Sequence, residues 1–593
     1  MDALCNLTLK LFDHQGTGLI EYGNNIETLR RAYTRIASAV TAHAVSPRLM
    51  CSAKQYLDLS RRKLVLETIF IVSGFSTPDH LIMLRGAPQL GGQYTVTPEQ
   101  AAFLALFFSL DNVPDSLFES VMRFPHQMRA PLVLAWIAQS KVMTLQGEER
   151  RGRLLTEFHF DTSAGISEEL ILLMVQSWMH CSYAEHPDKH QFKEKLNLMW
   201  KDLCRTSGLK SKFRRRQGLQ RPTLLIAAER MNPAHAMHRC YGHHLSALKD
   251  RFHVILMVQH KYYIDSLKAL FDEIILVDTN VNGKDVAAKL AKAQADIIYY
   301  PSLGMADWTE LTCNLRFAPI QIMTVGHPAP ACSNEIDYVL VQNSHLGGAK
   351  KMGGRVVVRK LNGSYVPHPQ IPEAMEVNSG GPRRVVSIAI SAMAMKLSPR
   401  FLDTCLEIER RSSVEIVYHF FPSVPGVWMD NLKWSLKSRF KSCVIYNSMP
   451  YPSYLNRLAE CDMALSPFPF GNTNTAVDYC VAGIPFVAYY GDEILSMCDG
   501  DVMALADLPS WMLTRTTEEY IQSSLKLVED AALRSDLREF LLRPATRTRI
   551  FDGQDEDSKD FADSIMWIYQ NHEELIVKEQ AVYQVGSTLP VEV

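Results

Sequence analysis

The sequence predicts an all-helical N-terminal domain followed by two doubly wound α/β halves. Three observations predict this fold. Apolar residues recur at helical spacing through about residues 1–215. Short strand-like runs then alternate with helical stretches, which is typical of a parallel sheet covered by helices. The alternation stops at a segment rich in Gly and Pro, 362–382, and starts again after it, so we expect two such halves.

Composition excludes several classes of protein. The 593 residues carry 62 Lys+Arg against 64 Asp+Glu, a net charge of −2, so no global basic field favours nucleic acid. The longest apolar run, Ala101–Leu110, is far shorter than the ~18–20 residues of a membrane span. The N-terminus MDALCNLTLKLFDHQG lacks the pattern of a signal peptide, and none of the 12 cysteines forms a C-x-x-C pair. We therefore expect a cytoplasmic protein with no membrane span and no nucleic-acid partner.

The helical domain is predicted to comprise residues 1–215. Ile26–Ala44, Pro98–Ser109 and Glu168–Met179 carry apolar residues at helical spacing. The composition then changes at Arg205–Pro222, RTSGLKSKFRRRQGLQRP, which is basic and poor in apolar residues. A domain linker is the favoured interpretation. A phosphate-binding or nucleic-acid patch remains the alternative.

The two α/β halves are predicted over residues 222–370 and 383–550. Expected strands of the first are Leu224–Ala227, His253–Val258, Glu273–Val277, Asp296–Tyr300 and Ile320–Val325, with helices at His235–Lys249 and Lys284–Ala295. Expected strands of the second are Val385–Ser391, Val414–Phe421, Val444–Asn447, Met463–Ser466 and Phe486–Tyr490. Residues 555–593 are predicted to form a C-terminal helix and tail, and a helix at Lys559–His572 is long enough to cross back to the first half. A cleft between the halves, at the carboxyl ends of strands, is where nucleotides bind.

The most informative motif is Cys461–Pro485, CDMALSPFPFGNTNTAVDYCVAGIP. A strand leads through a Gly471-Asn472-Thr473-Asn474 turn into a helix expected to begin near Thr475, and three of these turn residues are good helix caps. The helix start offers unpaired N–H groups and a positive dipole end. Asp478 shares a face with Asn474 and suits a ribose diol. A capping turn with an incidental Asp is the alternative.

Two further strand ends carry candidate residues. Lys396 follows Val385–Ser391 and can neutralise a leaving diphosphate without a metal, although a surface lysine extended over neighbouring methionines is the simpler interpretation. After the first strand, Asn232 is expected to cap a helix with Pro233 at its first position and His235 in its first turn, neutral and pointing to the cleft. We do not favour a metal site at His235, His238, Cys240, His243 and His244, because five such ligands cannot face one point on a helix.

Together these stretches resemble one family. PSLGMADWTELTCNLRFAPIQ, VGHPAP, MKLSP and SPFPFGNTN with Asp478 are similar to the bacterial cytoplasmic N-glycosyltransferases that modify secreted adhesins, and MHCSY and PAH around His235 match too. The resemblance covers about residues 175–515. That group belongs with the O-GlcNAc transferases in glycosyltransferase family 41. The resemblance implies a GT-B fold behind an all-helical domain. It also implies inverting, metal-independent transfer of glucose, sometimes galactose, from a UDP-sugar to Asn in Asn-X-Ser/Thr sequons.

The resemblance also implies roles for single residues. Lys396 would hold the diphosphate, Asp478 the ribose, and Asn474 with the turn Gly471–Thr473 the phosphates. His235 would lie beside the acceptor and the donor sugar. The resemblance implies no metal and no cofactor beyond the UDP-sugar substrate, and an acceptor protein such as an adhesin.

Three positions depart from the pattern that the family leads us to expect. Met393 stands where a hydroxyl side chain is expected on the phosphates, and Ser448 where a histidine is expected near the uracil. A glutamine expected around Ser423 is missing. These departures leave open a different donor or acceptor, or a protein-binding module with a vestigial cleft. A nucleotide-sugar epimerase of the same fold would need a pair of carboxylates for acid–base work, and no such pair is apparent in the matching loops.

Overall fold

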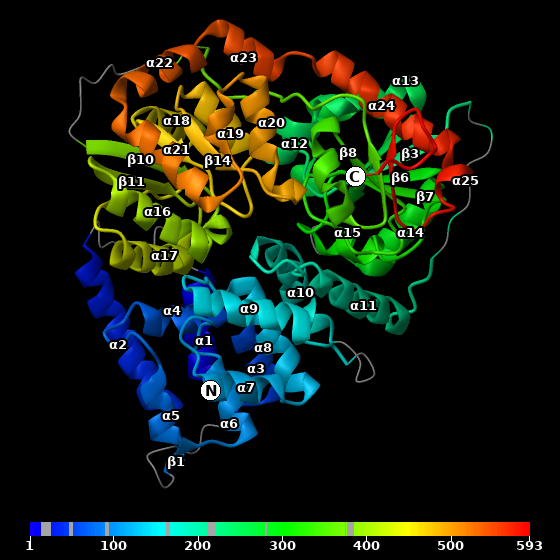
Figure 1. The fold of residues 1–593 in the computed structure, drawn as a ribbon. Coiled ribbons are helices and arrows are strands. Elements are labelled where there is room, and N and C mark those ends of the chain that lie inside the picture. The colour runs from blue at the N-terminus through cyan, green and yellow to red at the C-terminus, as the bar shows by residue number, and fades with distance from the viewer. Residues whose placement is uncertain are drawn as a thin grey trace. The chain divides into compact units, whose positions relative to one another are not determined.

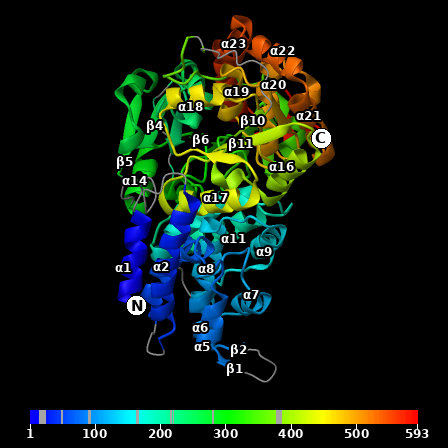
Figure 2. The same ribbon diagram turned by 90° about the vertical axis from the view of Figure 1, so that its left-hand side faces the viewer.

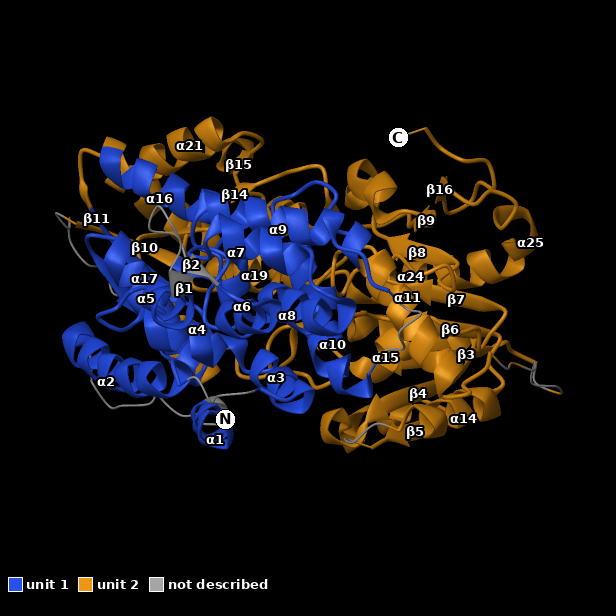
Figure 3. Cartoon of the chain, turned by 90° about the horizontal axis from the view of Figure 1, so that it is seen from below, with its two compact units in different colours: residues 1–192, 390–410, 416–449 blue, residues 193–389, 411–415, 450–593 orange. Residues whose placement is uncertain are grey.

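The computed structural model describes residues 1–13, 25–46, 51–88, 94–161, 167–211, 213, 218, 220–278, 282–373, 375 and 385–592. Parts of the segment 205–222, interpreted above as a linker, and of the segment 362–382, which is rich in Gly and Pro, lie outside these residues. The chain divides into two compact units (Figure 3). Unit 1 comprises 1–192, 390–410 and 416–449, and unit 2 comprises 193–389, 411–415 and 450–593. The four domains predicted from the sequence are continuous segments of the chain, whereas each compact unit combines several segments. The predicted domain boundaries therefore stay predictions.

Unit 1 contains the N-terminal helices. Their bounds are α1 (Asp2–Asp13), α2 (Ile26–Ala44), α3 (Ala53–Ser60), α4 (Lys63–Ile71), α5 (Asp79–Arg85), α6 (Pro98–Ala105), α7 (Asp115–Met122), α8 (His126–Gln139), α9 (Leu145–Glu157) and α10 (Ile171–His180). Helix α8 is buried along its second half and contacts α3, α4, α6, α9 and α10, so it forms the centre of this region. Strands β1 (Ala87–Pro88) and β2 (Tyr94–Thr95) pair beside α5 (Figure 2). No helix of the described residues is long and apolar enough to cross a membrane.

The first α/β half is an eight-stranded sheet, and all of its strand pairs are parallel. Its order is β16-β9-β8-β7-β6-β3-β4-β5. The bounds are β3 (Thr223–Ala228), β4 (His253–Gln259), β5 (Glu273–Val277), β6 (Ile297–Tyr300), β7 (Ile320–Met323), β8 (Tyr338–Val341), β9 (Arg355–Val358) and β16 (Ala581–Gln584). In β3, Ile226 pairs with Leu256 on one side and Tyr299 on the other, and every residue of the strand is buried. The continuous apolar sequence of β3 follows from that position, because both faces of a central parallel strand are covered.

The C-terminal helix returns to this first sheet, as the sequence predicts. Helix α24 (Gln554–Gln570) lies across it near β3 and β6 (Figure 1). Phe561, Ala562, Ile565 and Ile568 of α24 belong to the same apolar core as the strands. The chain then adds β16 parallel to β9, a strand that the sequence analysis did not anticipate.

The second sheet has six strands in the order β12-β11-β10-β13-β14-β15, and β11 with β12, β10 with β13, β13 with β14 and β14 with β15 pair in parallel. The bounds are β10 (Val385–Ser391), β11 (Glu415–Phe421), β12 (Cys443–Ile445), β13 (Met463–Leu465), β14 (Phe486–Tyr489) and β15 (Leu513–Thr514). In both sheets the strand that comes first in the chain is central and the order reverses beside it. Loops after such strands form the usual binding crevice of an open α/β sheet. The expectation of two doubly wound halves behind a helical region is confirmed.

One predicted helix is wrong. His235–Lys249 forms three short pieces, α12 (Ala236–Tyr241), η4 (His243–Leu245) and α13 (Leu248–Arg251). The first helical residue is Ala236, so Asn232 is not the cap and Pro233 does not occupy the first position. The chain breaks near Gly242, which places His243 and His244 against α24.

Candidate functional site

A buried carboxylate organises the loops at the end of the first sheet. Glu229, directly after β3, accepts hydrogen bonds from the Ser302 hydroxyl (2.6 Å) and the Thr309 hydroxyl (2.5 Å). The backbone N–H groups of Gly304, Met305 and Ala306 donate to the same carboxylate at 2.9–3.1 Å. Burial raises the pKa of Glu229, while these donors act in the opposite direction. The loop YPSLGMAD therefore takes its shape from a residue more than seventy positions earlier.

His235 caps helix α12. Its backbone is extended, and the N–H of Met237 donates to its Nδ1 at 3.2 Å. Burial, followed by the charge of Arg230, lowers the pKa of His235 to about 4, so the ring is neutral at pH 7. A neutral imidazole that accepts at Nδ1 carries its proton on Nε2. His235 therefore offers an N–H donor from Nε2, and in this tautomer Nε2 is not available as a base.

The GNTN turn leads into α19 (Asn474–Val481), one residue from the predicted start. Asp499, fully buried, accepts from the Asn472 N–H (2.8 Å) and the Ser466 hydroxyl (2.8 Å). A Cβ on Gly471 would meet Asp499 Oδ2 at 2.4 Å, so only glycine fits there. Thr473 is the N-cap residue, but its side chain makes no capping hydrogen bond. The buried Asp499 carboxylate therefore holds the turn in place, and no side chain caps the start of α19.

Asp478 lies on α19 at the centre of a polar group built from four chain segments. Its Oδ1 accepts from Arg239 Nη2 (2.8 Å) and from the Tyr451 hydroxyl (2.7 Å). The Tyr451 ring, at the start of α18 (Tyr451–Ala459), stacks on His368 with centroids 3.6 Å apart. No hydrogen bond from a described residue reaches Asp478 Oδ2. The carboxylate is thus oriented through Oδ1.

The site elements of unit 2 contact one another. Asn474 Nδ2 lies 3.4 Å from the Ala236 carbonyl and 3.2 Å from Cys240 Sγ, which brings the start of α19 to α12. The rings of His327 and Phe470 are 5.7 Å apart, so the GHP and FPFGN motifs also meet. The structure therefore brings together His235, the GNTN turn and Asp478.

Lys396 and Ser448 lie in unit 1. Lys396 ends the short helix η8 (Ala394–Lys396) after β10, and it is half-buried. Met393, three residues earlier, is 41% exposed, so its side chain stands open at the position where a hydroxyl was expected. Ser448 lies exposed in the loop between β12 and α18. Their predicted roles stay predictions.

Sequence reasoning missed four residues of this site: Glu229, Arg239, His368 and Tyr451. Arg239 carried a usable signal, since it lies four positions after His235 and so on the same side of a helix. The other three carried none, because their partners lie far away in the sequence.

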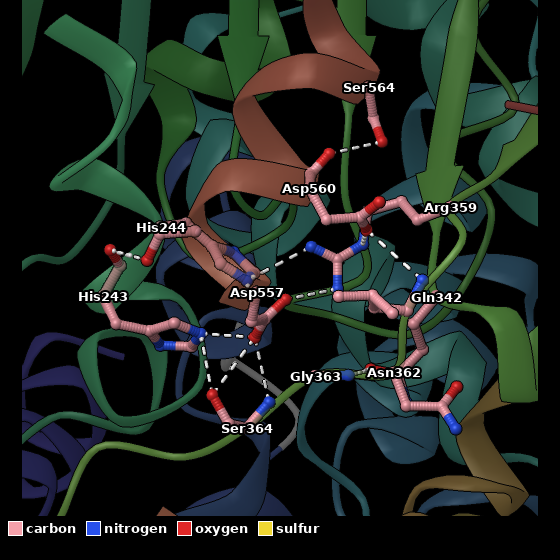
Figure 4. Close-up of polar contacts among 12 residues, drawn as sticks. His243, His244, Gln342, Arg359, Asn362, Gly363, Ser364, Asp557, Asp560 and Ser564 are labelled. Carbon is pink, nitrogen blue, oxygen red and sulfur yellow. Dashed lines mark hydrogen bonds and ion pairs between the residues drawn. The ribbon is translucent and has the colours of Figure 1, made fainter. Parts of the chain in front are cut away.

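A second polar cluster lies where α24 meets the first half (Figure 4). Asp557 Oδ2 is 2.5 Å from His243 Nε2 and 3.2 Å from His244 Nε2, and its Oδ1 accepts from Arg359 at 2.7 Å. Ser364 N–H donates to the same carboxylate at 2.9 Å. The three ligand atoms lie close enough to surround an ion. However, the Arg359 guanidinium already neutralises Asp557 and would repel a cation, so we interpret the cluster as the polar anchor of α24.

Comparison with known proteins supports the family resemblance drawn from the sequence motifs. A family model described as HMW1 domain 2 matches residues 119–203. The UDP-glucose:protein N-beta-glucosyltransferase of Actinobacillus pleuropneumoniae serotype 5b (strain L20) is 27% identical over 540 residues, covering 88% of this chain and 86% of that protein. The protein of the same name from serotype 7 (strain AP76) is 26% identical with the same coverage.

A solved structure adds information on the fold. A mutant of the Thermobaculum terrenum O-GlcNAc transferase matches with a TM-score of 0.53 and 15% identity, covering 91% of this chain and 98% of that one. At this identity the match shows the fold alone, a GT-B fold behind a helical domain. The resemblance drawn from the motifs is thereby confirmed: the chain is a hexosyltransferase that is similar over most of its length to the UDP-glucose:protein N-beta-glucosyltransferases and shares the fold of the O-GlcNAc transferase.

Proposed function

We propose that the protein transfers glucose from UDP-glucose to the side-chain amide of Asn in Asn-X-Ser/Thr sequons of an acceptor protein such as an adhesin, with inversion and without a metal. The single observation that carries this proposal is the oriented carboxylate of Asp478 beside the uncapped start of α19. A ribose hydroxyl suits Asp478 Oδ2, and phosphate oxygens suit the N–H groups of the helix start, which no side chain caps. The names of the relatives support a UDP-glucose donor and a protein acceptor.

The reaction would be an in-line displacement at the anomeric carbon. The amide nitrogen of the acceptor forms the new bond and loses one proton, which passes to the departing phosphate or to water, while the bond to the UDP oxygen breaks and UDP leaves with the electron pair. Lys396 and the dipole of α19 would stabilise the charge that develops on the diphosphate. His235 would donate from Nε2 to an oxygen of the sugar or the acceptor, since its Nδ1 already accepts from Met237. A weakly nucleophilic amide gains rate mainly through orientation.

One experiment tests the proposal. The protein is incubated with an Asn-X-Thr peptide and a panel of nucleotide sugars, and the mass of the peptide is measured by mass spectrometry. We expect the mass of one hexose, with UDP-glucose preferred and EDTA without effect. A peptide with Gln in place of Asn is the matched control. Modification of the Gln peptide, or a strict need for added Mg²⁺ or Mn²⁺, would contradict the proposal.

The alternative of a binding module with a vestigial cleft rests on Met393 and Ser448. Calorimetry with UDP separates the two functions. A vestigial cleft should bind no UDP and modify no peptide, whereas the proposed enzyme should bind UDP competitively with UDP-glucose.

A further inference from the structure

Two positively charged side chains lie at the carboxyl ends of β3 and β4, in unit 2. Arg230 follows the last residue of β3 by two positions, and Lys261 belongs to the short helix η5 (His260–Tyr262), which directly follows β4. β3 and β4 are neighbours in the parallel sheet, so their carboxyl ends meet at one edge. Arg230 is half-buried and Lys261 is exposed. With Tyr262 they form the basic platform.

Tyr262 holds the two cations together. Its hydroxyl accepts from Arg230 Nη1 at 2.6 Å. Its ring centre lies 4.7 Å from the guanidinium carbon of Arg230 and 4.9 Å from Lys261 Nζ, and an aromatic ring attracts cations at such distances. Arg230 is thereby oriented before a ligand arrives, which reduces the entropy lost on binding.

Neither cation of the basic platform has a counter-charge. Across the described ranges of the chain, no carboxylate forms an ion pair with Arg230 or Lys261, and the hydrogen bond to Tyr262 occupies only one of the guanidinium donors. Asp307, on which the charge of Lys261 acts, is half-buried and accepts from the Trp308 N–H at 2.8 Å. The platform therefore offers positive charge and N–H donors to a ligand.

The basic platform extends the site away from the expected phosphate contacts. Arg230 is close enough to His235 for its charge to lower the pKa of the ring, after burial. The second half approaches elsewhere, since Phe470 meets His327 after β7 and Asn474 meets α12. In the order β7-β6-β3-β4, three strand spacings separate β7 from β4, about 14 Å. The platform thus lies beyond His235 from the side where UDP is expected.

We propose that Arg230 and Lys261 bind a carboxylate of the acceptor protein, an Asp or Glu side chain near the sequon. This inference rests on the proposed function and adds to it a preference for acidic acceptor sequences. A guanidinium presents two parallel N–H groups that match a carboxylate, and the lysine adds a second charge. The net charge of the whole chain is −2, so a preference for acidic peptides must come from a local group.

Two acceptor peptides of equal length test the proposal. Each contains one Asn-X-Thr sequon, flanked on both sides by Glu residues in one peptide and by Gln residues in the other. Gln matches Glu in size, carries no charge and creates no second sequon. With UDP-glucose, the Glu peptide should have a KM about fivefold lower at a similar kcat, because the ion pair forms in the ground state and the transition state alike. The difference should shrink at about 0.5 M salt, since salt screens exposed charges.

Substitutions locate the preference. The double variant Arg230→Gln/Lys261→Gln should give the two peptides equal KM values without changing the KM for UDP-glucose. The matched control is Arg221→Gln/Lys292→Gln, which also removes two exposed charges. Arg221 precedes β3, and Lys292 lies in the last turn of α14 (Gly283–Ala293), so both are remote from the carboxyl ends of the strands. This control should keep the preference for the Glu peptide.

Several results would overturn the proposal. These are equal KM values for both peptides in the unaltered chain, a preference that persists in Arg230→Gln/Lys261→Gln, and a preference that the control also loses. A higher KM for UDP-glucose in the double variant, with the peptide preference intact, would assign the two cations to the donor phosphates instead. If the double variant fails to fold in a thermal melt, Lys261→Gln alone, at an exposed side chain, should still reduce the preference.

Failure of the proposed function is distinguishable from failure of this inference. If neither peptide is modified, the proposed function is contradicted. Fluorescence anisotropy of labelled Glu and Gln peptides in the presence of UDP needs no transfer and still measures the preference. Tighter binding of the Glu peptide that depends on Arg230 and Lys261 would support the inference, and equal affinities would overturn it.

Discussion

Arg239 Nη2 lies 2.8 Å from Oδ1 of Asp478, and both side chains are buried. The two residues are 239 positions apart and come from α12 and α19. The Tyr451 hydroxyl donates to the same oxygen, so the ion pair and the hydrogen bond together fix the rotation of the carboxylate. A carboxylate held in this way can receive a ribose hydroxyl without first losing side-chain freedom, which favours binding.

We predict that Tyr451→Phe weakens UDP binding by about 0.5–1.5 kcal/mol, the usual worth of one hydrogen bond. The phenylalanine keeps the ring stacked on His368, so the melting temperature should change little. Asp478→Ala should weaken UDP binding more, by about 1.5–3 kcal/mol, because it removes the charged acceptor itself. Calorimetry with UDP measures both losses.

The control for this pair is Tyr569→Phe, in which a half-buried tyrosine of α24 loses its hydroxyl. It should bind UDP like the parent protein. Asp478→Ala also leaves Arg239 buried without its partner, so its thermal melt must be recorded. A folded Asp478→Ala variant with parental affinity for UDP would remove Asp478 from the ribose site.

Lys396→Ala tests the predicted diphosphate contact. It should cost about 2–4 kcal/mol of transition-state stabilisation, as the loss of a charged stabiliser typically does. The side chain is half-buried at the end of a short helix, so the fold should persist. Steady-state kinetics with UDP-glucose and a peptide measure the change. Lys441→Ala, at an exposed lysine of the same unit, should keep the parental rate, and equal rates for both variants would exclude Lys396 from the phosphate site.

The strands could be predicted because their signal is local. β5 and β10 begin and end where runs of apolar residues bounded by turns place them, at Glu273–Val277 and Val385–Ser391. The GNTN turn and the start of α19 were predictable for the same reason, since cap residues and a following apolar face stand next to each other in the sequence.

The remaining features depend on distant partners. His235–Lys249 reads as one helix locally, yet the chain breaks near Gly242 because His243 and His244 meet Asp557, more than three hundred residues later. The same limit applies to Tyr451 and His368, whose stacking joins the second half to the segment between the halves. A single sequence carries no trace of such pairs, so the orientation of Asp478 could not be predicted, and its role at the ribose stays a prediction.

Glu229 gives a prediction on stability. Glu229→Ala removes the acceptor of three buried N–H groups and two hydroxyls, and it should lower the free energy of unfolding by about 3–5 kcal/mol, in the range of a broken buried network. Glu229→Gln should cost much less, because its carbonyl can take the place of Oε1 while the Ser302 hydroxyl turns to accept from the amide. Denaturant unfolding of both variants measures the difference. Equal losses would show that the negative charge, and not the geometry of the acceptor, holds the loop.

The final prediction concerns His345, which lies on η7 (Asn343–Met352), and its partner Asp501 on α20 (Cys498–Leu505). The two side chains are 2.8 Å apart and buried. Burial opposes the charge on His345, but Asp501 outweighs it and raises the pKa to about 10. An unfolded histidine has a pKa of about 6.5. The folded state therefore binds the proton more tightly, and this contribution to stability is complete below about pH 6.5 and disappears as the pH rises toward 10.

His345→Gln should reveal this contribution in denaturant unfolding at a series of pH values. The variant should be less stable than the parent at pH 6, and the gap should narrow steadily toward pH 10. His260→Gln, at an exposed histidine whose ring lies 3.9 Å from Asp278, is the matched control and should show a small gap at every pH. A gap for His345→Gln that stays constant from pH 6 to pH 10 would mean that the histidine acts through packing and neutral hydrogen bonds instead of through its charge.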